Sequence, residues 1–442
     1  MGRARLTRVG TAASAAALVA ALLMAGCGVI LPDGAGTATP SASSTAGSAA
    51  GTAPSSAARS ALGFRAYRDA VQWPAKADAY VPAGLGLEAL VPDGHGCVLG
   101  VGVYRTGYQD LPARWVPGSG CTRLALDPPP GQGGWEPGGG AVSVGGSGPV
   151  VLRWTDGSLI SVADRVSRTP PSGRTQELAS LNLPVPDDPR SESADRGAAT
   201  AAVQVGRRLL IGGGERVAQV EHAVVWLSED RGATLRRPVL PVPAIPGDTA
   251  GISGIAAHGG EVVAIGGMVS NAMDRAPNAT GRLPIWHSSD AGGHWTVSVV
   301  PGLPAGAFLR GVLRLGDGWL AYGFTQRAGD PDRPVLLVSP DGKSWTRLGG
   351  SAVSAVGTGD VLAGTVDAAG RPVLVGSAIQ PREKPDTDPV YCGAVWTADA
   401  GGRTDWSRGD LGCGAAPPQT AATLADGRVL LAGNSDLWLR AR

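Results

Sequence analysis

Four cysteines have the setting and the spacing to form disulfides, and four cysteines allow three connectivities. The local pairing, Cys97 with Cys121 and Cys392 with Cys413, closes loops of 24 and 21 residues. Each such bridge would stabilise the fold by about 3 kcal/mol. No two cysteines have C-x-x-C spacing, and the 5 histidines are scattered along the chain. We therefore predict disulfides at these cysteines, no metal site and no cofactor.

A second pattern places a hydroxyl residue, an aspartate two positions later and a glycine in the same order four times. The carboxylate and the hydroxyl can accept hydrogen bonds from turn amides, and glycine permits the positive φ that such a turn needs. A tryptophan just after the turn can pack back over it. We interpret the motifs as hairpin turns with no direct chemistry. Their residues are Ser228, Asp230 and Gly232; Ser288, Asp290, Gly292 and Trp295; Ser339, Asp341, Gly342 and Trp345; and Thr397, Asp399, Gly401 and Trp406.

Seven short apolar runs, most of which end on glycine, must supply strands for these turns to join. They begin 52 to 59 residues apart and lie at 96–103, 148–155, 207–214, 261–268, 318–325, 371–378 and 428–435. The runs are too short for helices and are bounded by turn residues, which is typical of buried strands. The repeat predicts an all-β, seven-bladed β-propeller with four-stranded blades around a channel. Each run is the predicted second strand of its blade, and each motif turn joins the third strand to the outer one.

Too few residues follow the last apolar run to form the outer strand of its blade. Only seven residues follow the run at 428–435, and an open sheet edge invites aggregation. The segment 64–75 precedes the first repeat and could supply the missing strand. Trp73 would then stand in this blade where Trp295 stands in its own. We expect this clasp between the two ends of the propeller.

The N-terminus has the organisation of an export signal. Arg3, Arg5 and Arg8 precede an apolar stretch at 12–24 that is too short to span a bilayer comfortably. The small residues that end on Cys27 resemble the lipobox of bacterial lipoproteins, although Met24 stands where leucine is commonest. This resemblance implies that Cys27 is acylated and anchors the chain at the extracytoplasmic face of the cell membrane. An ordinary secreted protein is the alternative.

Composition divides the chain into three parts. We predict a lipoprotein signal peptide at 1–26, a flexible tether at 27–62 and the propeller at 63–442. The tether is rich in alanine, serine, glycine and proline, so it cannot bury a core. A net charge of +1 with 17% charged residues argues against nucleic acid as a partner, and we expect a monomer. The 68 glycines and 35 prolines favour short strands over helices.

The octapeptide at 288–295, SSDAGGHW, resembles the Asp-box, or BNR, repeat, which has the pattern S-x-D-x-G-x-x-W. That repeat occurs in sialidases, sortilin-type receptors, some glucanases and photosystem-II-assembly-factor-like propellers. The resemblance covers about half of the chain. Leu235 replaces the tryptophan in the first copy, one residue is missing from the third copy, and two are inserted in the fourth. The first two repeats lack the motif. The resemblance implies the propeller fold and not one function, because unrelated activities share it.

If the protein is an enzyme, sialidases are the class with the strongest precedent among proteins that carry this repeat. Their chemistry requires an arginine cluster, a tyrosine nucleophile with a glutamate partner, and an acid/base aspartate. The F/Y-R-I-P motif of that family is missing, and the sequence RLPIW at 282–286 matches it only poorly. Three arginines lie in or near predicted strands: Arg153, Arg310 and Arg314. Arginine is also common on the surfaces of blades, so these residues need not form a substrate site. Tyr322 is predicted to be a packed strand residue, and no residue is assigned as catalytic.

The tryptophans are better explained by packing than by ligand binding. Trp226 and Trp286 both precede a motif serine by two residues, so they share one strand face and should pack between blades. Trp396 is one residue out of that register and is expected to face the other way. Trp115 and Trp135 lie in longer predicted loops and could reach a ligand.

Binding is therefore the favoured function: a lipid-anchored propeller that holds an envelope protein or glycan through the loops at one end. A sialidase-like glycoside hydrolase is the alternative. Three histidines are expected to be solvated turn residues rather than ligands: His258, His287 and His294. An arginine cluster facing a Tyr–Glu pair at the channel mouth would favour the hydrolase. A channel lined by glycine and small apolar side chains would favour the binding module.

Overall fold

The computed structural model describes residues 61–72, 84–106, 109–127, 150–171, 174–181, 195–217, 220–243, 251–266, 281–325, 332–349, 357–379, 390–413 and 416–442. In these ranges the chain forms strands and one short 3₁₀ turn at Ser119–Cys121. None of the described segments is a helix long and apolar enough to cross a bilayer. The signal peptide, Cys27 and most of the tether lie outside the described residues.

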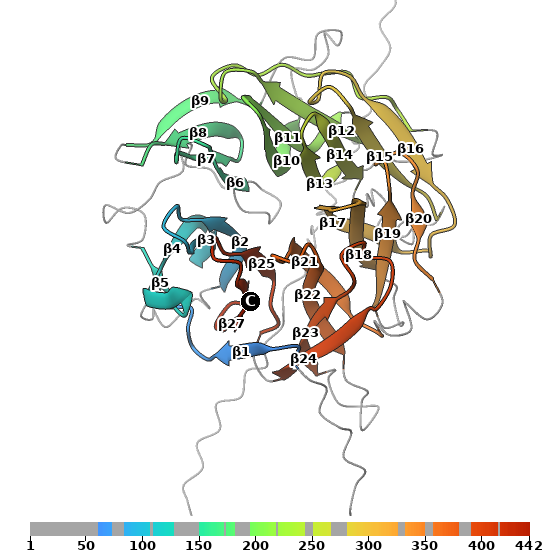
Figure 1. The fold of residues 1–442 in the computed structure, drawn as a ribbon. Helices are drawn as coiled ribbons and strands as arrows, with labels where there is room; N and C mark the ends of the chain where they lie inside the picture. The colour runs from blue at the N-terminus through green and yellow to red at the C-terminus, as the bar shows by residue number, and fades with distance from the viewer. Residues whose placement is uncertain are drawn as a thin grey trace, which may run out of the picture. The chain divides into compact units, whose positions relative to one another are not determined.

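The strands form seven antiparallel sheets, numbered here as blades 1 to 7 in chain order (Figure 1). Their strands are β2 (Gly84–Pro92), β3 (Val98–Thr106), β4 (Gln109–Pro117) and β5 (Leu124–Leu126) in blade 1; β6 (Val150–Arg153), β7 (Leu159–Val162), β8 (Arg165–Thr169) and β9 (Gln176–Ser180) in blade 2; β10 (Asp195–Val205), β11 (Arg208–Val217) and β12 (Val220–Ser228) in blade 3; β13 (Ile252–His258), β14 (Glu261–Gly266), β15 (Leu283–Ser288) and β16 (Thr296–Val300) in blade 4; β17 (Ala307–Leu315), β18 (Gly318–Thr325), β19 (Arg333–Ser339) and β20 (Thr346–Arg347) in blade 5; β21 (Asp360–Val366), β22 (Pro372–Ile379), β23 (Tyr391–Thr397) and β24 (Ser407–Cys413) in blade 6; and β25 (Thr420–Thr423), β26 (Val429–Ala432), β27 (Leu437–Arg440) and β1 (Phe64–Tyr67) in blade 7.

The first strand of each blade packs against the first strands of both neighbouring blades, which closes the ring. The cycle of contacts runs β2, β6, β10, β13, β17, β21, β25 and back to β2. These seven strands therefore surround the channel (Figure 1). The predicted seven-bladed β-propeller is confirmed.

Six of the seven apolar runs form the second strand of their blade, as predicted, and one does not. The run at 148–155 forms β6, which is the first strand of blade 2 and pairs with β7. The turn around Asp156 and Gly157 follows this run instead of preceding it. Because both strands of this hairpin are apolar, the pattern alone could not distinguish them.

The clasp between the ends of the propeller is present. β1 pairs antiparallel with β27, with Phe64 opposite Arg440 and Tyr67 opposite Leu437. Phe64 is buried in a cluster with Trp438 from the same blade and with residues of blade 6. The N-terminal strand thus completes the C-terminal blade and covers its edge. Trp73 lies outside the described residues.

Blade 3 departs from the four-strand rule. Its outer strand is reduced to one bridge between Leu227 and Arg236. The chain beyond this bridge contains Pro238 and Pro241, which have no backbone N–H to donate to a ladder. This segment still covers the blade, because the Trp286 indole of blade 4 donates a hydrogen bond to the Pro241 carbonyl at 3.0 Å.

Buried tryptophans on the third strands of blades 1, 3, 4, 6 and 7 join each of these blades to the preceding one. Four of them donate an indole N–H across that interface: Trp115 to the Gln72 carbonyl, Trp226 to Leu181, Trp286 to Pro241 and Trp438 to Leu411. Trp115 is fully buried in β4, so its predicted position in a ligand-accessible loop is wrong. Trp135 lies outside the described residues.

The expected orientation of Trp396 is also wrong. It packs with Leu320 and Leu336 of blade 5, so it faces the preceding blade like the other third-strand tryptophans. The one-residue offset in the sequence belongs to the turn that follows Trp396 and not to the tryptophan itself.

Two local disulfides are formed, Cys97–Cys121 and Cys392–Cys413. The first joins the turn before β3 to the 3₁₀ turn that follows β4. The second joins paired positions on β23 and β24. Both therefore fix hairpins within single blades, as the local pairing would require.

Antiparallel strands give the propeller two different ends. The turns from first to second strand and from third to outer strand lie at one end, here called the tight-turn end; those at 259–260 and 289–295 are examples. The remaining connections lie at the opposite end, here called the loop end, where β17 and β21 begin. Many of the loop-end connections, including 267–280, 326–331 and 380–389, fall outside the described residues.

Candidate functional site

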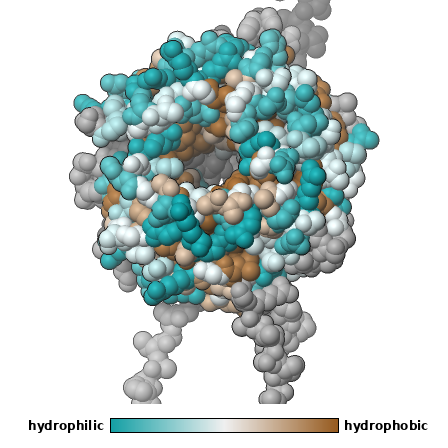
Figure 2. Space-filling view, in the orientation of Figure 1, coloured by the Kyte–Doolittle hydropathy of each residue, from teal (hydrophilic) through white to brown (hydrophobic). Residues whose placement is uncertain are grey.

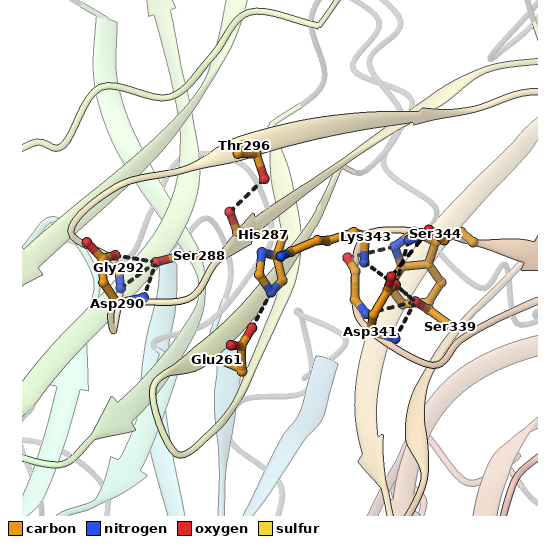
Figure 3. Close-up of polar contacts among 12 residues, drawn as sticks. Glu261, His287, Ser288, Asp290, Gly292, Thr296, Ser339, Asp341, Lys343 and Ser344 are labelled. Atoms are coloured by element: carbon orange, nitrogen blue, oxygen red, sulfur yellow. Dashed lines mark hydrogen bonds and ion pairs between the residues drawn. The ribbon is translucent and has the colours of Figure 1, made fainter.

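The repeated serine–aspartate turns are hydrogen-bonded structures at the tight-turn end (Figure 3). The Ser288 hydroxyl donates to Asp290 Oδ1 at 2.8 Å and accepts the Gly292 N–H at 2.9 Å. Ser228 and Ser339 make the same two contacts in their own turns. Hydrogen bonds from the backbone and side chain of His294 hold the pKa of Asp290 well below its usual range. The aspartate is thus a fixed acceptor and not a proton-transfer group.

The glycines of these turns also pack on the preceding blade. A Cβ at Gly292, which has a φ of +85°, would overlap the Leu210 side chain of blade 3. One at Gly342, with a φ of +73°, would meet Val263 of blade 4. The turns therefore close their own hairpins and join neighbouring blades.

The fourth turn differs from its predicted assignment. Ala398 stands where the other copies have serine, and the Thr397 hydroxyl instead donates to the Pro372 carbonyl at 2.9 Å. Gly402, and not Gly401, has the positive φ, at +64°. Its carbonyl accepts the Trp406 indole N–H, just as Gly292 accepts that of Trp295. The aspartate here is shifted by one position relative to the strand, which sequence spacing alone concealed.

His287 is buried and not solvated, contrary to expectation. Its Nε2 hydrogen-bonds the Glu261 carboxylate on β14, and its ring lies against Gly342 in the turn of blade 5 (Figure 3). His294 is 95% exposed and His258 is exposed, as predicted. The Glu261–His287 pair is thus part of the packing between blades 4 and 5.

A different set of residues lies on the strands that border the channel. The first strands of five blades each contain a β-bulge, at which one residue is left out of the pairing with the second strand. We call these five residues the collar: Glu88, Thr200, Ser253, Arg310 and Leu362. Bulges commonly re-aim side chains beside binding sites. The collar therefore places four polar residues and one apolar residue on strands that border the channel.

Second-strand glycines make these bulges possible. A Cβ at Gly102, Gly213, Gly323 or Gly376 would overlap a carbonyl oxygen of the first strand beside the bulge. Glycine alone lets the two backbones approach this closely. This requirement explains why the apolar runs in the sequence so often end on glycine.

Three charged residues lie close to the loop end of blades 5 and 6: Arg310, Asp332 and Asp360. Arg310 is exposed on β17 and has no hydrogen bond or ion pair to another described residue. Asp360 begins β21, and the Ser377 backbone donates to its carboxylate at 3.2 Å. Asp332 is held next to it, because its carbonyl accepts the Gly359 N–H at 2.7 Å.

The two carboxyl groups raise each other's energy when both are ionised. Burial and the Asp360 charge raise the pKa of Asp332 to about 6. Burial also raises the pKa of Asp360, although hydrogen bonds from Ser377 partly oppose this effect. The site thus combines the exposed guanidinium of Arg310, whose charge partly offsets the raised pKa of Asp360, with two carboxyl groups that hold protons more tightly than usual.

The described residues do not supply the sialidase constellation. Tyr322 is buried, and burial raises its pKa to about 12, which disfavours a nucleophilic phenolate. Arg153 donates to three backbone carbonyls and Arg314 to two, so both guanidinium groups hold turns together at the tight-turn end. Of the three arginines considered in the sequence, only Arg310 is free to meet a ligand.

Small residues dominate several of the channel strands. β13 reads ISGIAAH, β21 DVLAGTV and β25 TAAT. Figure 2 shows an opening at the centre of the ring, with hydrophobic residues along its wall and hydrophilic residues on the surrounding rim. This lining is the feature expected of a binding module. No group of three or more potential metal ligands occurs among the residues that the structure describes.

Sequence comparison assigns no family: no family model and no curated protein matches this chain. Solved structures with a similar architecture include the extracellular domain of a putative one-component system from B. thetaiotaomicron, with 8% identity and a TM-score of 0.47 over 82% of this chain. The chain spans 39% of the length of that protein.

Two further solved structures are enzymes. The GH93 α-L-arabinofuranosidase of Fusarium graminearum is 13% identical, with a TM-score of 0.32 over 52% of this chain and 73% of that one. A streptogramin B lyase is 12% identical, with a TM-score of 0.33 over 66% of this chain and 92% of that one. At these levels of similarity the comparisons carry nothing about function.

Proposed function

We propose that this protein is an extracytoplasmic, membrane-anchored lipoprotein whose propeller is a binding or scaffold module for an envelope protein or glycan. The collar is the observation that carries the proposal. Five bulges, four of them permitted by a glycine on the second strand, place polar and apolar residues on strands that border one channel, and Arg310 is exposed among them. A rigid ring with a few placed polar groups suits recognition better than chemistry.

The anchor rests on the sequence of the first 27 residues. An export signal ending on Cys27 resembles a lipobox, and acylation there would hold the mature chain at the outer face of the membrane. Two disulfides suit an oxidising compartment, since cytosolic thiols are kept reduced. We also propose that the domain acts as a monomer.

Affinity capture with a matched pair of variants tests the binding role. Full-length protein, purified in detergent and immobilised, is incubated with solubilised envelope from its own cell, and retained proteins and glycans are identified by mass spectrometry. We expect one species to be enriched by the wild type and by Arg403→Glu, an exposed tight-turn change. The same species should be lost with Arg310→Glu. Equal retention by both variants, or no enrichment, would contradict the proposal.

A glycoside hydrolase remains the second candidate because of one observation, the Asp332–Asp360 pair. Two neighbouring carboxyl groups with raised pKa values can supply a general acid and a general base. The test is the release of reducing sugar from isolated envelope polysaccharide by the wild type and by Asp332→Asn and Asp360→Asn. Loss of release in both variants would favour the hydrolase. No release by the wild type would eliminate it.

A further inference from the structure

Arginines gather on the tight-turn end of blades 2 and 3, far along the strands from the collar. Seven of them stand in or next to the turns there, against three carboxylates, and we call this set the basic patch. Its arginines are Arg153, Arg168, Arg174, Arg207, Arg208, Arg231 and Arg236, and its carboxylates are Asp156, Glu229 and Asp230. The patch therefore has a net positive charge on a protein whose overall charge is only +1.

Two of the three carboxylates are each shared between two arginines. Asp156 accepts from Arg168 at 2.7 Å and from Arg231 of the next blade at 3.0 Å. Glu229 lies 3.2 Å from Arg208 and 3.7 Å from Arg236. One negative charge offsets only one of the two guanidinium groups in each cluster. These bridges thus hold the arginines in place without neutralising them.

The other arginines of the patch have no carboxylate partner among the described residues. Arg153 donates to the carbonyls of Pro92, Asp93 and Gly157, which orient its guanidinium but cancel no charge. Arg174 and Arg207 are exposed and make no hydrogen bond or ion pair with the described chain. Their charge is available to a partner outside the molecule.

The same end of blades 4 to 6 has the opposite balance. Five cationic side chains there, Arg314, Lys343, Arg347, Arg371 and Arg403, face seven carboxylates, Glu261, Asp290, Asp317, Asp341, Asp367, Asp399 and Asp405. The tight-turn end of blades 2 and 3 is therefore more positive than that of blades 4 to 6. A general excess of arginine at the tight turns does not explain it.

The chain enters the propeller at this same end. Third strands run toward the tight turns, so the last residues of β27 lie there, and Phe64 pairs with Arg440. The Arg442 side chain lies beside Gly427 in the first tight turn of blade 7. Phe64, from which the polypeptide leads back to Cys27, thus lies at the tight-turn end and not at the loop end.

We infer that the basic patch binds the anionic headgroups of a lipid bilayer, so that the propeller rests on the membrane with its loop end outward. The inference rests on the proposed lipid anchor. The arginines are spread over two blades and do not converge on one point, which fits a charged surface better than a single phosphate ion. Because the anchoring segment enters at this end, the patch is the face nearest to the bilayer along the chain.

The physical effect is a second membrane signal beside the acyl group. Basic residues near an anionic surface are attracted over a Debye length, about 8 Å at physiological salt. Stable attachment commonly combines one lipid chain with such a patch. Contact with the membrane at the tight-turn end would leave the collar facing the envelope.

Resonance energy transfer in reconstituted vesicles tests this orientation. Full-length acylated protein carries a dye on His258→Cys at the tight-turn end, and the vesicles carry an acceptor on a lipid headgroup. Vesicles of phosphatidylcholine are compared with vesicles that also contain phosphatidylglycerol. The patch variant is Arg174→Glu with Arg207→Glu. Its control is Lys343→Glu with Arg403→Glu, which makes the same change in charge at the same end.

We expect phosphatidylglycerol to raise energy transfer for the wild type and the control, and the patch variant to lose that rise. High salt should abolish the rise in every protein. Equal transfer in both lipids, or equal loss in both variants, would overturn the inference. A third outcome would also overturn it: the rise in energy transfer is lost in a buffer with inorganic phosphate but kept in a chloride buffer of equal ionic strength. That result would indicate a phosphate site instead.

A protein that fails to stay in the vesicles would refute the proposed anchor and not the patch. Co-sedimentation of the same full-length chain with anionic vesicles then tests the patch alone. Binding that is lost in the patch variant supports the inference, and absence of binding overturns it. Capture of a ligand at the collar is a separate measurement, so the binding role and the membrane patch can fail independently.

Discussion

The Ser288 hydroxyl occupies a buried position in which it both donates to Asp290 and accepts the Gly292 N–H. Ser288→Ala would leave that backbone N–H without a partner. We expect a loss of about 1–3 kcal/mol in the free energy of unfolding, measured by denaturant titration. His294→Ala is the control in the same turn, because His294 is 95% exposed. Its loss should stay below about 0.5 kcal/mol, and equal losses would contradict the assigned role of the hydroxyl.

Because the pKa of Asp332 is raised, we predict that the free energy of unfolding depends on pH. Its pKa of about 6 in the folded protein exceeds the ordinary value of 3.8, so the protonated form is favoured by folding. The stability it contributes is present below about pH 4 and is lost as the pH rises through 6. Asp332→Asn should therefore be more stable than the wild type at pH 7.5, by about 1 kcal/mol after allowance for solvent screening.

The same comparison at pH 4 provides the control for Asp332. There the carboxyl is protonated in the folded protein and partly protonated in the unfolded chain, so the unfolding curves of the wild type and Asp332→Asn should differ much less than at pH 7.5. A stability difference that is the same at both pH values would show that the substitution acts through packing and not through ionisation.

Single residues could be predicted from the sequence where their contacts are local. The hydroxyl–aspartate turns at Ser288 and Ser339 follow from neighbours in the chain, and so does the exposure of His294. His287 could not be predicted, because its burial depends on the turn of the next blade. The assignment of Gly401 was wrong since the aspartate of that turn had shifted by one position against its strand.

At the scale of strands, the glycine opposite four of the five bulges is the critical residue. A Cβ at Gly323 would overlap the Phe308 carbonyl on the first strand of blade 5. We expect Gly323→Ala to lower the free energy of unfolding by about 3 kcal/mol, as overpacked sites do. Gly316→Ala in the following turn meets nothing within 4 Å and should change it by less than about 1 kcal/mol. Indistinguishable thermal unfolding of the two variants would contradict the bulge geometry.

The strand repeat could be predicted from sequence spacing, but the bulges could not. An apolar run ending on glycine identifies a buried second strand in six blades. The bulge depends on how that strand pairs with its neighbour, and residue order does not reveal this register. The run at 148–155 shows the limit, because an apolar first strand and an apolar second strand look alike.

At the scale of the whole molecule, the clasp should control stability. Phe64 is buried between blades 6 and 7, and Arg440 lies over its ring at 5.0 Å. Phe64→Ala should lower the free energy of unfolding by about 3 kcal/mol or more and expose the edge of β27 to aggregation. Arg65→Ala, at an exposed position of the same strand, is the control for chemical denaturation and light scattering. A Phe64→Ala protein as stable as this control would refute the clasp.

The closed ring of seven blades and its clasp could be predicted from the sequence because each repeat has the same local pattern. The two ends of the ring could not, since their properties arise when distant turns meet. The basic patch joins arginines from β6 to the segment after β12, and the collar joins bulges from five blades. The basic patch has no common spacing in the sequence, and the collar follows the blade repeat without a shared residue type.

Site-specific photo-crosslinking in living cells tests the division between the two ends most directly. A photoreactive amino acid replaces Arg310 at the collar in one strain and Arg207 in the basic patch in another. After irradiation, crosslinked species are identified by mass spectrometry. The account predicts an envelope protein or glycan at position 310 and lipid at position 207. The same species at both positions, or lipid at position 310, would contradict it.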